Sequence, residues 1–375
     1  MHAAELPSPD PQALATSRAL LERLSAELES AGNWISFARY MELVLYEPGL
    51  GYYASGARKL GAGGDFVTAP ELSPLFGRTL ARQVRELLRP GDAVLEFGAG
   101  SGALAEVLTS EMPGVEYQVL ETSPELKQRQ QQKLGGRVQW LDRLPGRFRG
   151  VMLANEVVDA MPVHAIAWTR KGVMERGVCA NEGQLAWCDR LADGLVLSES
   201  EKISLEIPSS GRYESELALA ARGWMRSLGA ILERGAILVV DYGFPAHEYF
   251  HPQRSMGTLA CHYRHRVHGD PFYLPGLQDV TAHVDFSALA RAAADAGLEL
   301  LGFAGQAQFL VNCGITDLLA GENPGDPKRY LPAAAAAQKL LSPSEMGELF
   351  KVLAVGKGVT EPLTGFGRGD RGAAL

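Results

Sequence analysis

Residues 94–104 read VLEFGAGSGAL, an apolar run followed by an acid and by glycines at alternate positions, Gly98, Gly100 and Gly102. An apolar strand that ends in such a loop brings backbone N–H groups up to a ligand, with the N-terminus of a helix behind them. Glycine is required because a Cβ would block both the tight turn and the close approach of the ligand. The motif therefore predicts an α/β fold with a ligand at the end of this strand.

Two cofactors fit this loop. Gly98, Gly100 and Ala103 match the dinucleotide-binding pattern, and Glu121 stands about 20 residues further along, where a ribose-binding acid is expected. The same residues fit the loop that binds S-adenosylmethionine (SAM). Glu96 favours SAM, because SAM has an ammonium and a sulfonium in place of a pyrophosphate, and an acid attracts both groups.

From residue 93 onward the chain alternates short apolar strands with helices. Strands are expected at 93–97, 117–121, 138–141, 151–156 and 236–243, and helices at 103–110 and 124–134. Such alternation predicts a parallel sheet with ligands at the carboxyl ends of its strands. A C-terminal pair of strands, at 298–310 and ending near residue 355, is typical of methyltransferase sheets. We therefore expect an α/β fold with a seven-stranded Rossmann-like SAM methyltransferase sheet, an N-terminal helical extension and a small antiparallel β insertion.

Periodicity outside this core predicts further elements. Apolar residues at helical spacing indicate helices at 12–29, 35–46, 71–88 and 213–232, and alternation indicates hairpins within 163–206. The expected division is an N-terminal helical cap and cofactor lid (1–90), the first half of the core (91–162), an antiparallel β insertion (163–210), the second half of the core with an irregular substrate-side loop at 244–284 (211–360), and a disordered tail (361–375).

Composition excludes several classes of function and predicts the location of the protein. The net charge of −8 leaves no basic field for general binding to nucleic acid or to a membrane surface. No apolar run reaches the ~20 residues of a membrane span. The four cysteines include no C-x-x-C pair and predict no disulfide framework. Because the first residues are also too acidic for a transit peptide, we expect a cytoplasmic protein.

The end of the fourth expected strand carries the candidate catalytic residues Asn155, Glu156 and Asp159. This strand end faces the cofactor, so its polar groups meet the methyl group in transfer. Transfer from a sulfonium is downhill, and the enzyme mainly orients the nucleophile and takes its proton. Two carboxylates suit a guanidinium, although Asp159 could equally cap the next helix. At the cofactor, we expect Asn155 to make a contact, Glu121 to bind the ribose and Asp142 to contact the adenine amino group.

Histidines crowd the segment CHYRHRVH at 261–268. The spacing of Cys261 and its neighbouring histidines matches no familiar metal site, and the interleaved arginines repel a cation, so we predict no metal. Instead, we expect a loop at the substrate entrance with Tyr263 and His265 as contacts.

Several segments together resemble the MidA family of SAM-dependent methyltransferases. They are YMELVLYEPGLGYY, GDFVTAPELSPLFG, LEFGAGSGALA, NEVVDAMPVH, VVDYG and GLQDVTAHVDF, in matching order over about residues 34–356. Mitochondrial members are complex I assembly factors that dimethylate an arginine of a complex I subunit. The resemblance thus implies a protein substrate, and it implies a lid over the cofactor formed by Gly64, Asp65, Phe66, Thr68 and Glu71.

Two alternatives stay open at this point. One is an NAD-dependent oxidoreductase, against which Glu96 and the C-terminal strand pair count. The other is a non-catalytic assembly protein that keeps the SAM fold as a docking platform, because a binding loop alone does not prove turnover. The sequence does not indicate an oligomeric state.

Overall fold

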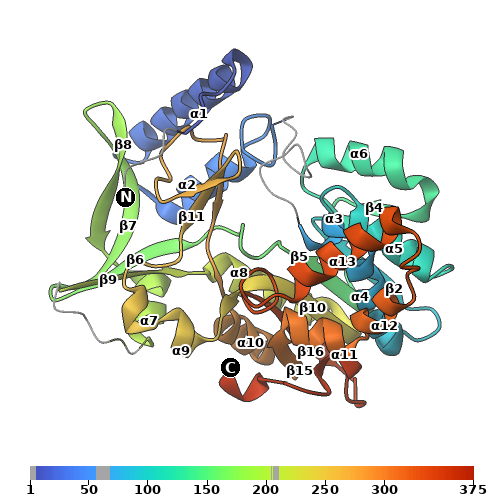
Figure 1. Cartoon of the computed structure of the whole chain (residues 1–375). Coiled ribbons are helices and arrows are strands. Elements are labelled where there is room, and N and C mark those ends of the chain that lie inside the picture. The colour runs from blue at the N-terminus through green and yellow to red at the C-terminus, as the bar shows by residue number, and fades with distance from the viewer. Residues whose placement is uncertain (1–5, 56–67, 204, 206–210) are drawn as a thin grey trace.

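The structure, a computed structural model, describes residues 6–55, 68–203, 205 and 211–375. Its centre is a mixed sheet in which seven strands follow the order β15-β16-β10-β5-β2-β3-β4, and β14 (Val284–Asp285) pairs with β10 beside this path (Figure 1). The strands are β2 (Ala93–Phe97), β3 (Glu116–Leu120), β4 (Gln139–Leu141), β5 (Phe148–Asn155), β10 (Leu232–Phe244), β15 (Glu299–Gly305) and β16 (Phe350–Lys357). The predicted α/β class is confirmed.

The direction of the strands determines where the site lies. β2, β3, β4, β5 and β10 run parallel, whereas β16 runs antiparallel to both β10 and β15. The carboxyl ends of the parallel strands therefore meet at one edge of the sheet, where open α/β sheets bind their ligands.

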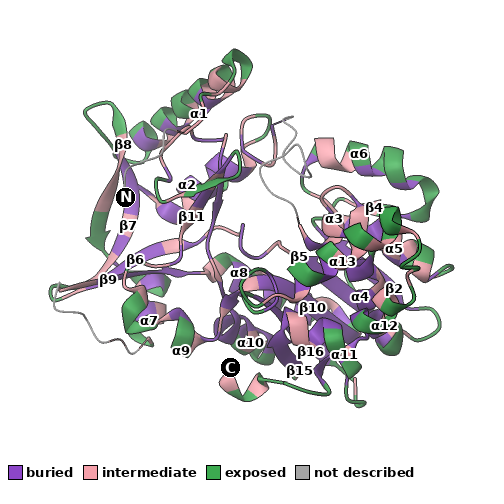
Figure 2. Cartoon of the chain, viewed as in Figure 1, coloured by how far each residue is buried: buried purple, intermediate pink, exposed green. Residues whose placement is uncertain are grey.

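Helices cover both faces of this sheet, so its strands are buried on both sides (Figure 2). They are α3 (Ala69–Leu72), α4 (Pro74–Leu87), α5 (Ala103–Glu111), α6 (Pro124–Leu134), α8 (Leu219–Ile231), α10 (Phe286–Asp295), α11 (Gln306–Asn312), α12 (Ile315–Ala320) and α13 (Pro327–Leu341). Val94 packs with Leu80 of α4 on one face, and Leu95 packs with Met225 of α8 on the other, as the two-residue period of a strand requires.

A second, antiparallel sheet has the order β1-β7-β6-β9, with β8 paired to β7. Its strands are β1 (Ile35–Ser36), β6 (His164–Thr169), β7 (Gly172–Asn181), β8 (Gln184–Leu191) and β9 (Arg212–Leu217), and α7 (Gly194–Glu201) lies beside them. The N-terminal helices α1 (Pro11–Ser30) and α2 (Phe37–Tyr46) pack against this sheet through a cluster that includes Leu24, Phe37 and Val178.

Several elements expected from the sequence differ from those in the structure. Residues 212–217 form β9 rather than the first turns of a helix, because pairing with β6 buries Tyr213 and Leu217. The expected strand at 298–310 ends at Gly305, and α11 follows. Apolar runs fit a strand and a buried helix equally well, which explains this error. Residues 194–201 form the helix α7, although only hairpins were expected within 163–206.

The expected irregular loop at 244–284 is in fact structured. It contains α9 (Ala246–Tyr249), η2 (Pro252–Arg254) and a small sheet of β11 (Ala260–Tyr263), β12 (Arg266–His268) and β13 (Asp279–Thr281). The C-terminal segment, expected to be disordered, contains η3 (Thr364–Phe366) and η4 (Gly372–Ala374). Phe366 is buried there, and its ring lies 5.3 Å from that of Phe309, so apolar burial holds the segment on the core.

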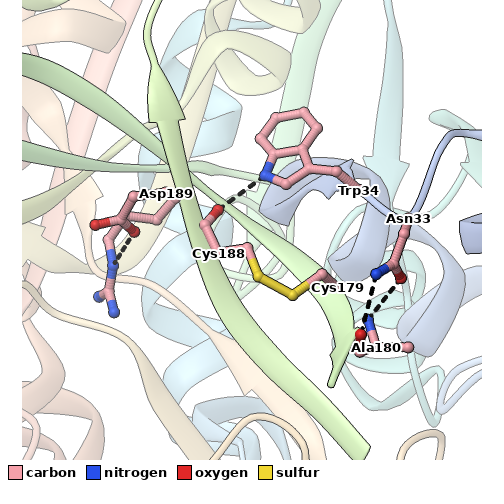
Figure 3. The surroundings of a disulfide bond; sticks show 7 residues. Asn33, Trp34, Cys179, Ala180, Cys188 and Asp189 are labelled. Carbon is pink, nitrogen blue, oxygen red and sulfur yellow. Dashed lines mark hydrogen bonds and ion pairs between the residues drawn. A yellow bond between two sulfur atoms is a disulfide. The ribbon is translucent and has the colours of Figure 1, made fainter. Parts of the chain in front are cut away.

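A disulfide joins Cys179 of β7 to Cys188 of β8 (Figure 3). The expectation of no disulfide was wrong, because hairpin pairing brings together two cysteines whose sequence separation of 9 matches no familiar motif. Trp34 Nε1 donates a hydrogen bond to the Cys188 carbonyl at 2.8 Å, and the Asn33 side chain is hydrogen-bonded to the Ala180 backbone. The hairpin is thus fastened to the N-terminal helical region.

Over the described parts of the chain, no helix is both long and apolar enough to cross a bilayer.

Candidate active site

A cavity lies where the parallel strands end. Its lining comes from the end of β2 and the glycine loop after it, the ends of β3 and β5 with the residues that follow them, the first turns of α3, α5 and α6, and the end of α2 with the turn that follows it. The lining residues are Tyr46, Tyr53, Thr68, Pro70, Glu96, Gly98, Ala99, Gly100, Ser101, Ala103, Leu104, Glu121, Thr122, Leu126, Asn155, Glu156, Val157 and Ala160.

The glycine loop has the backbone that the sequence motif requires. Gly98, Gly100 and Gly102 have φ angles of 57°, 55° and 72°, in the left-handed region that residues other than glycine rarely adopt. A Cβ on Gly98 would also lie 3.2 Å from Val157 Cγ2. Gly102 caps α5 and does not line the cavity, so it shapes the turn from behind.

Glu96 lies at the end of β2 with only 3% of its surface exposed. The Tyr117 hydroxyl donates a hydrogen bond to its Oε2 at 2.8 Å. Burial raises the pKa of Glu96 to about 7, and the nearby Glu121 adds to the rise, while the Tyr117 hydrogen bond opposes it. A positive ligand group would restore the charged form.

Glu121 follows β3, and both of its carboxylate oxygens have partners. Oε1 accepts from the Ser123 backbone N–H at 2.9 Å, and Oε2 accepts from Gln130 Nε2 at 3.0 Å. Burial raises the pKa of Glu121, and these hydrogen bonds oppose the rise. The Gln130 amide also donates to the Gly100 carbonyl at 2.9 Å, so one side chain holds both the acid and the glycine loop.

Two expected cofactor contacts, Asp142 and Glu71, do not line the cavity. Asp142 does not line the cavity: its side chain is 88% exposed and pairs with Lys127 at 2.6 Å, because β4 ends one residue earlier and directs it toward α6. Glu71 forms a capping box with the cavity-lining Thr68 and does not itself line the cavity. Gly64, Asp65 and Phe66 lie outside the described residues.

Glu156, at the tip of β5, lines the cavity beside Asn155. It has a φ of 54°, a conformation rare for a residue with a side chain and common at functional sites. Its Oε1 accepts hydrogen bonds from the Ala69 N–H and from Asn155 Nδ2, both at 3.2 Å. Burial, and then repulsion by Asp159, raise the pKa of Glu156 to about 8.

Asp159 lies behind Glu156 rather than in the cavity lining. Its Oδ2 accepts a hydrogen bond of 2.6 Å from the Tyr242 hydroxyl, and burial raises its pKa. It neither lines the cavity nor caps a helix, so the structure supports an indirect role for this carboxyl.

Asp241 holds the loop that carries these acids, and sequence analysis missed its role. Its Oδ2 accepts from the backbone N–H groups of residues 157, 158 and 159 at 3.2, 2.9 and 3.3 Å. The Glu156 N–H in turn donates to the Val240 carbonyl at 2.9 Å. β10 therefore fixes the tip of β5, and the acid in VVDYG was the only sequence signal for this arrangement.

Tyr46 and Tyr53 also line the cavity, although no sequence signal distinguished them from the other aromatic residues near them. By contrast, the expected substrate contacts Tyr263 and His265 do not line it. Tyr263 is 3% exposed, and His265 lies in the turn between β11 and β12. Over the described residues, the histidines and acids form no group of three that could hold a metal ion.

The charges of the cavity indicate what it accepts. It contains three carboxyls, Glu96, Glu121 and Glu156, and no lysine or arginine among the residues described. No ion pair between described residues reaches these carboxyls. A pyrophosphate would meet three carboxyls and no cationic side chain among the described lining residues, whereas these carboxyls attract a sulfonium and an ammonium.

Comparisons with known proteins also indicate a protein that binds SAM. The family model described as "Putative S-adenosyl-L-methionine-dependent methyltransferase" matches residues 75–304. "Protein arginine methyltransferase NDUFAF7, mitochondrial" of Danio rerio is 30% identical, covering 90% of this chain and 87% of its own, and that of Mus musculus is 29% identical, covering 90% and 84%. A crystal structure from Burkholderia thailandensis, bound to S-adenosyl-homocysteine (SAH), is 50% identical with a TM-score of 0.94 and covers 99% of this chain and all of its own.

Proposed function

This chain belongs to the family of S-adenosyl-L-methionine-dependent methyltransferases, and on that premise we propose that it methylates the guanidinium of an arginine in a protein substrate. SAM is its cofactor. The NAD alternative is thereby set aside. The arginine acceptor is supported by relatives from fish and mouse whose names state arginine methylation.

One observation carries the proposal: Glu156 lies half-buried at the tip of β5, where it lines the cavity in a left-handed conformation and without a basic partner among the described residues. Such a carboxylate accepts the forked N–H groups of a guanidinium. A neutral or anionic acceptor would not offset the cost of ionising this carboxyl, whose pKa burial raises.

The chemistry assigns a task to each group. When bound, SAM supplies an electrophilic methyl group on a sulfonium sulfur. Glu156 and Asn155 bind and orient the guanidinium, and Glu156 takes the proton that the nitrogen loses as its bond to the methyl carbon forms. A pKa near 8 makes Glu156 a far stronger base than an exposed glutamate, which suits it to accept this proton.

The cofactor end completes the proposal. We assign the SAM ammonium to the side of Glu96 and the ribose hydroxyls to Glu121, with the backbone of residues 98–101 against the ligand. The protein substrate is proposed to be a subunit of respiratory complex I type, on the basis of the MidA resemblance. A cytoplasmic location stays a prediction of the sequence, which cell fractionation tests.

A labelling experiment tests the acceptor. Lysate of a strain lacking this protein is incubated with the purified chain and SAM that carries a labelled methyl group, and the labelled protein and residue are identified by mass spectrometry. We expect the label on a guanidine nitrogen of one protein. Label on lysine, or on a small molecule alone, would contradict the proposed acceptor.

Glu156→Gln and Gly98→Val serve as paired controls. The first is expected to bind SAH and transfer no label, and the second to bind neither SAM nor SAH. If Gly98→Val complemented a deletion strain fully, the chain would act as an assembly protein without catalysis.

A further inference from the structure

Two tyrosines from the N-terminal region line the same cavity as Ala160 and Glu156. Tyr46 ends α2, and Tyr53 lies in the turn that follows. Their rings are stacked, with centroids 5.6 Å apart and 23° between the planes. The Tyr46 hydroxyl donates to the Ala160 carbonyl at 2.9 Å, and the Tyr53 hydroxyl donates to Asp279 Oδ2 at 2.9 Å. Because both hydroxyls are engaged, ring surface is what these side chains offer to a ligand.

The electrostatics of the two rings suit a cation. Burial raises the pKa of both phenols, and the neighbouring Asp279 and Asp159 raise it further, so both rings are neutral at physiological pH. The face of a neutral aromatic ring attracts a cation through its quadrupole. A phenol whose hydroxyl donates a hydrogen bond to a carboxylate has a more electron-rich ring. This hydrogen bond to Asp279 therefore strengthens the attraction of a cation to the ring of Tyr53.

We infer that Tyr46 and Tyr53 are the residues that select a planar, delocalised cation in the acceptor subsite. This inference rests on the proposed arginine acceptor. A guanidinium lies flat on an aromatic face while its edge donates to Glu156, and it is weakly hydrated, so the transfer from water costs little. A lysine ammonium is compact and strongly hydrated and gains less from the same rings. A neutral urea group has the same shape but no charge for the ring or the carboxylate to attract.

Three small probes test the inference on the full chain loaded with SAH. They are the N-acetyl methylamides of arginine, lysine and citrulline, with affinities measured by ligand-observed NMR. The unmodified protein is expected to bind the arginine probe more tightly than the other two. Tyr46→Leu and Tyr53→Leu should each weaken arginine binding by about 3- to 30-fold and largely remove its preference over lysine. The preference for arginine over citrulline should persist, because Glu156 still favours the charged probe.

Matched variants separate the ring from the rest of the side chain. Tyr46→Phe retains the ring and should keep the preference for arginine over lysine, and Tyr330→Leu on α13 serves as a remote control of the same chemistry. SAH affinity, measured in parallel, reports that the site is intact. If a leucine variant fails to bind SAH, Asp279→Asn takes its place: it reduces the charge behind Tyr53, leaves both rings in place and should weaken arginine binding about two- to threefold.

The outcomes distinguish two failures. Leucine variants that bind SAH and keep the preference for arginine over lysine would overturn the role of the tyrosines and leave the arginine acceptor standing. An unchanged arginine affinity in Asp279→Asn, used in their place, would do the same. If the unmodified protein bound lysine or citrulline as well as arginine, the arginine acceptor itself would fail.

Discussion

The two ends of the cavity hold their carboxyls differently. At the cofactor end, Glu96 and Glu121 each accept hydrogen bonds from neighbouring groups, and the glycine loop supplies bare backbone. At the other end, Glu156 repels Asp159, and both raise the pKa of the buried Asp241. The cofactor end is therefore a preformed cradle, whereas burial and mutual repulsion at the acceptor end raise the pKa of its carboxyls, so that Glu156 keeps a proton near neutral pH until a cationic ligand restores the charged form.

The largest effect is expected at the tip of β5. Glu156→Gln keeps the shape of the side chain but removes its charge and its basicity, so the rate of methyl transfer should fall by about 10²- to 10⁴-fold. SAH affinity, measured by calorimetry, should change little, because the glycine loop and Glu121 are untouched. Glu125→Gln on α6 is the surface control. Single-turnover transfer at an unchanged rate would remove Glu156 from its proposed role.

The next effect concerns the loop that carries these acids. Asp241→Ala leaves three backbone N–H groups of residues 157–159 without their acceptor and should reduce the free energy of unfolding by about 3–5 kcal/mol. Asp142→Ala removes an exposed carboxyl that is paired with Lys127, and it should reduce the free energy of unfolding by less than about 1 kcal/mol. Urea unfolding measures both values. Equal losses would show that the buried carboxyl does not hold the loop.

The pH dependence of stability distinguishes the two ends. The folded state raises the pKa of Glu96 to about 7 and of Glu156 to about 8, so it binds protons more tightly than the unfolded chain does. Their contribution to stability is therefore full below about pH 4.5 and is lost as the pH rises through 7 and then 8. The loss is on the order of 3 kcal/mol for Glu96 and of 5 kcal/mol for Glu156.

Unfolding midpoints between pH 5 and pH 8.5 measure this slope. Glu96→Gln should flatten the slope up to about pH 7, and Glu156→Gln should flatten it up to about pH 8. Because other groups also titrate, the quantity to compare is the slope of stability against pH in the variant and in the unmodified protein. Identical slopes would contradict the raised pKa of the substituted glutamate.

The smallest effect is expected at Glu121. Glu121→Gln removes charge-assisted hydrogen bonds to the ribose, which should weaken SAM and SAH binding equally, by about 10- to 100-fold. Transfer at saturating SAM should proceed at nearly the normal rate, because this carboxylate lies at the cofactor end. A loss of rate with unchanged affinity would reverse the assignment of the two ends.

The cofactor end could be read from the sequence because it is local. One strand, one loop and one acid after the next strand define it. The glycines also indicate from the sequence alone that the backbone adopts positive φ angles there. Asp142 was placed wrongly because register alone does not show that β4 ends before it and that Lys127 lies within reach.

The acceptor end could be read only in part. Glu156 and Asn155 follow from their position at a strand end, but Asp241, Tyr46 and Tyr53 reach the site from distant segments through tertiary contacts. The same limit explains the missed β9 and the disulfide, since both depend on pairing between strands of the second sheet. Long-range pairing leaves little trace in local periodicity.

Proton release on binding tests the central claim most directly. SAM has one positive charge more than SAH, and calorimetry in buffers of different ionisation enthalpy at pH 7.5 counts the protons that each ligand displaces. We expect SAM to release up to about three-quarters of a proton more than SAH, because about that fraction of Glu156 is protonated at pH 7.5, and this excess should vanish in Glu156→Gln. Equal proton release for the two ligands in the unmodified protein would contradict the claim that the acceptor end awaits a cation.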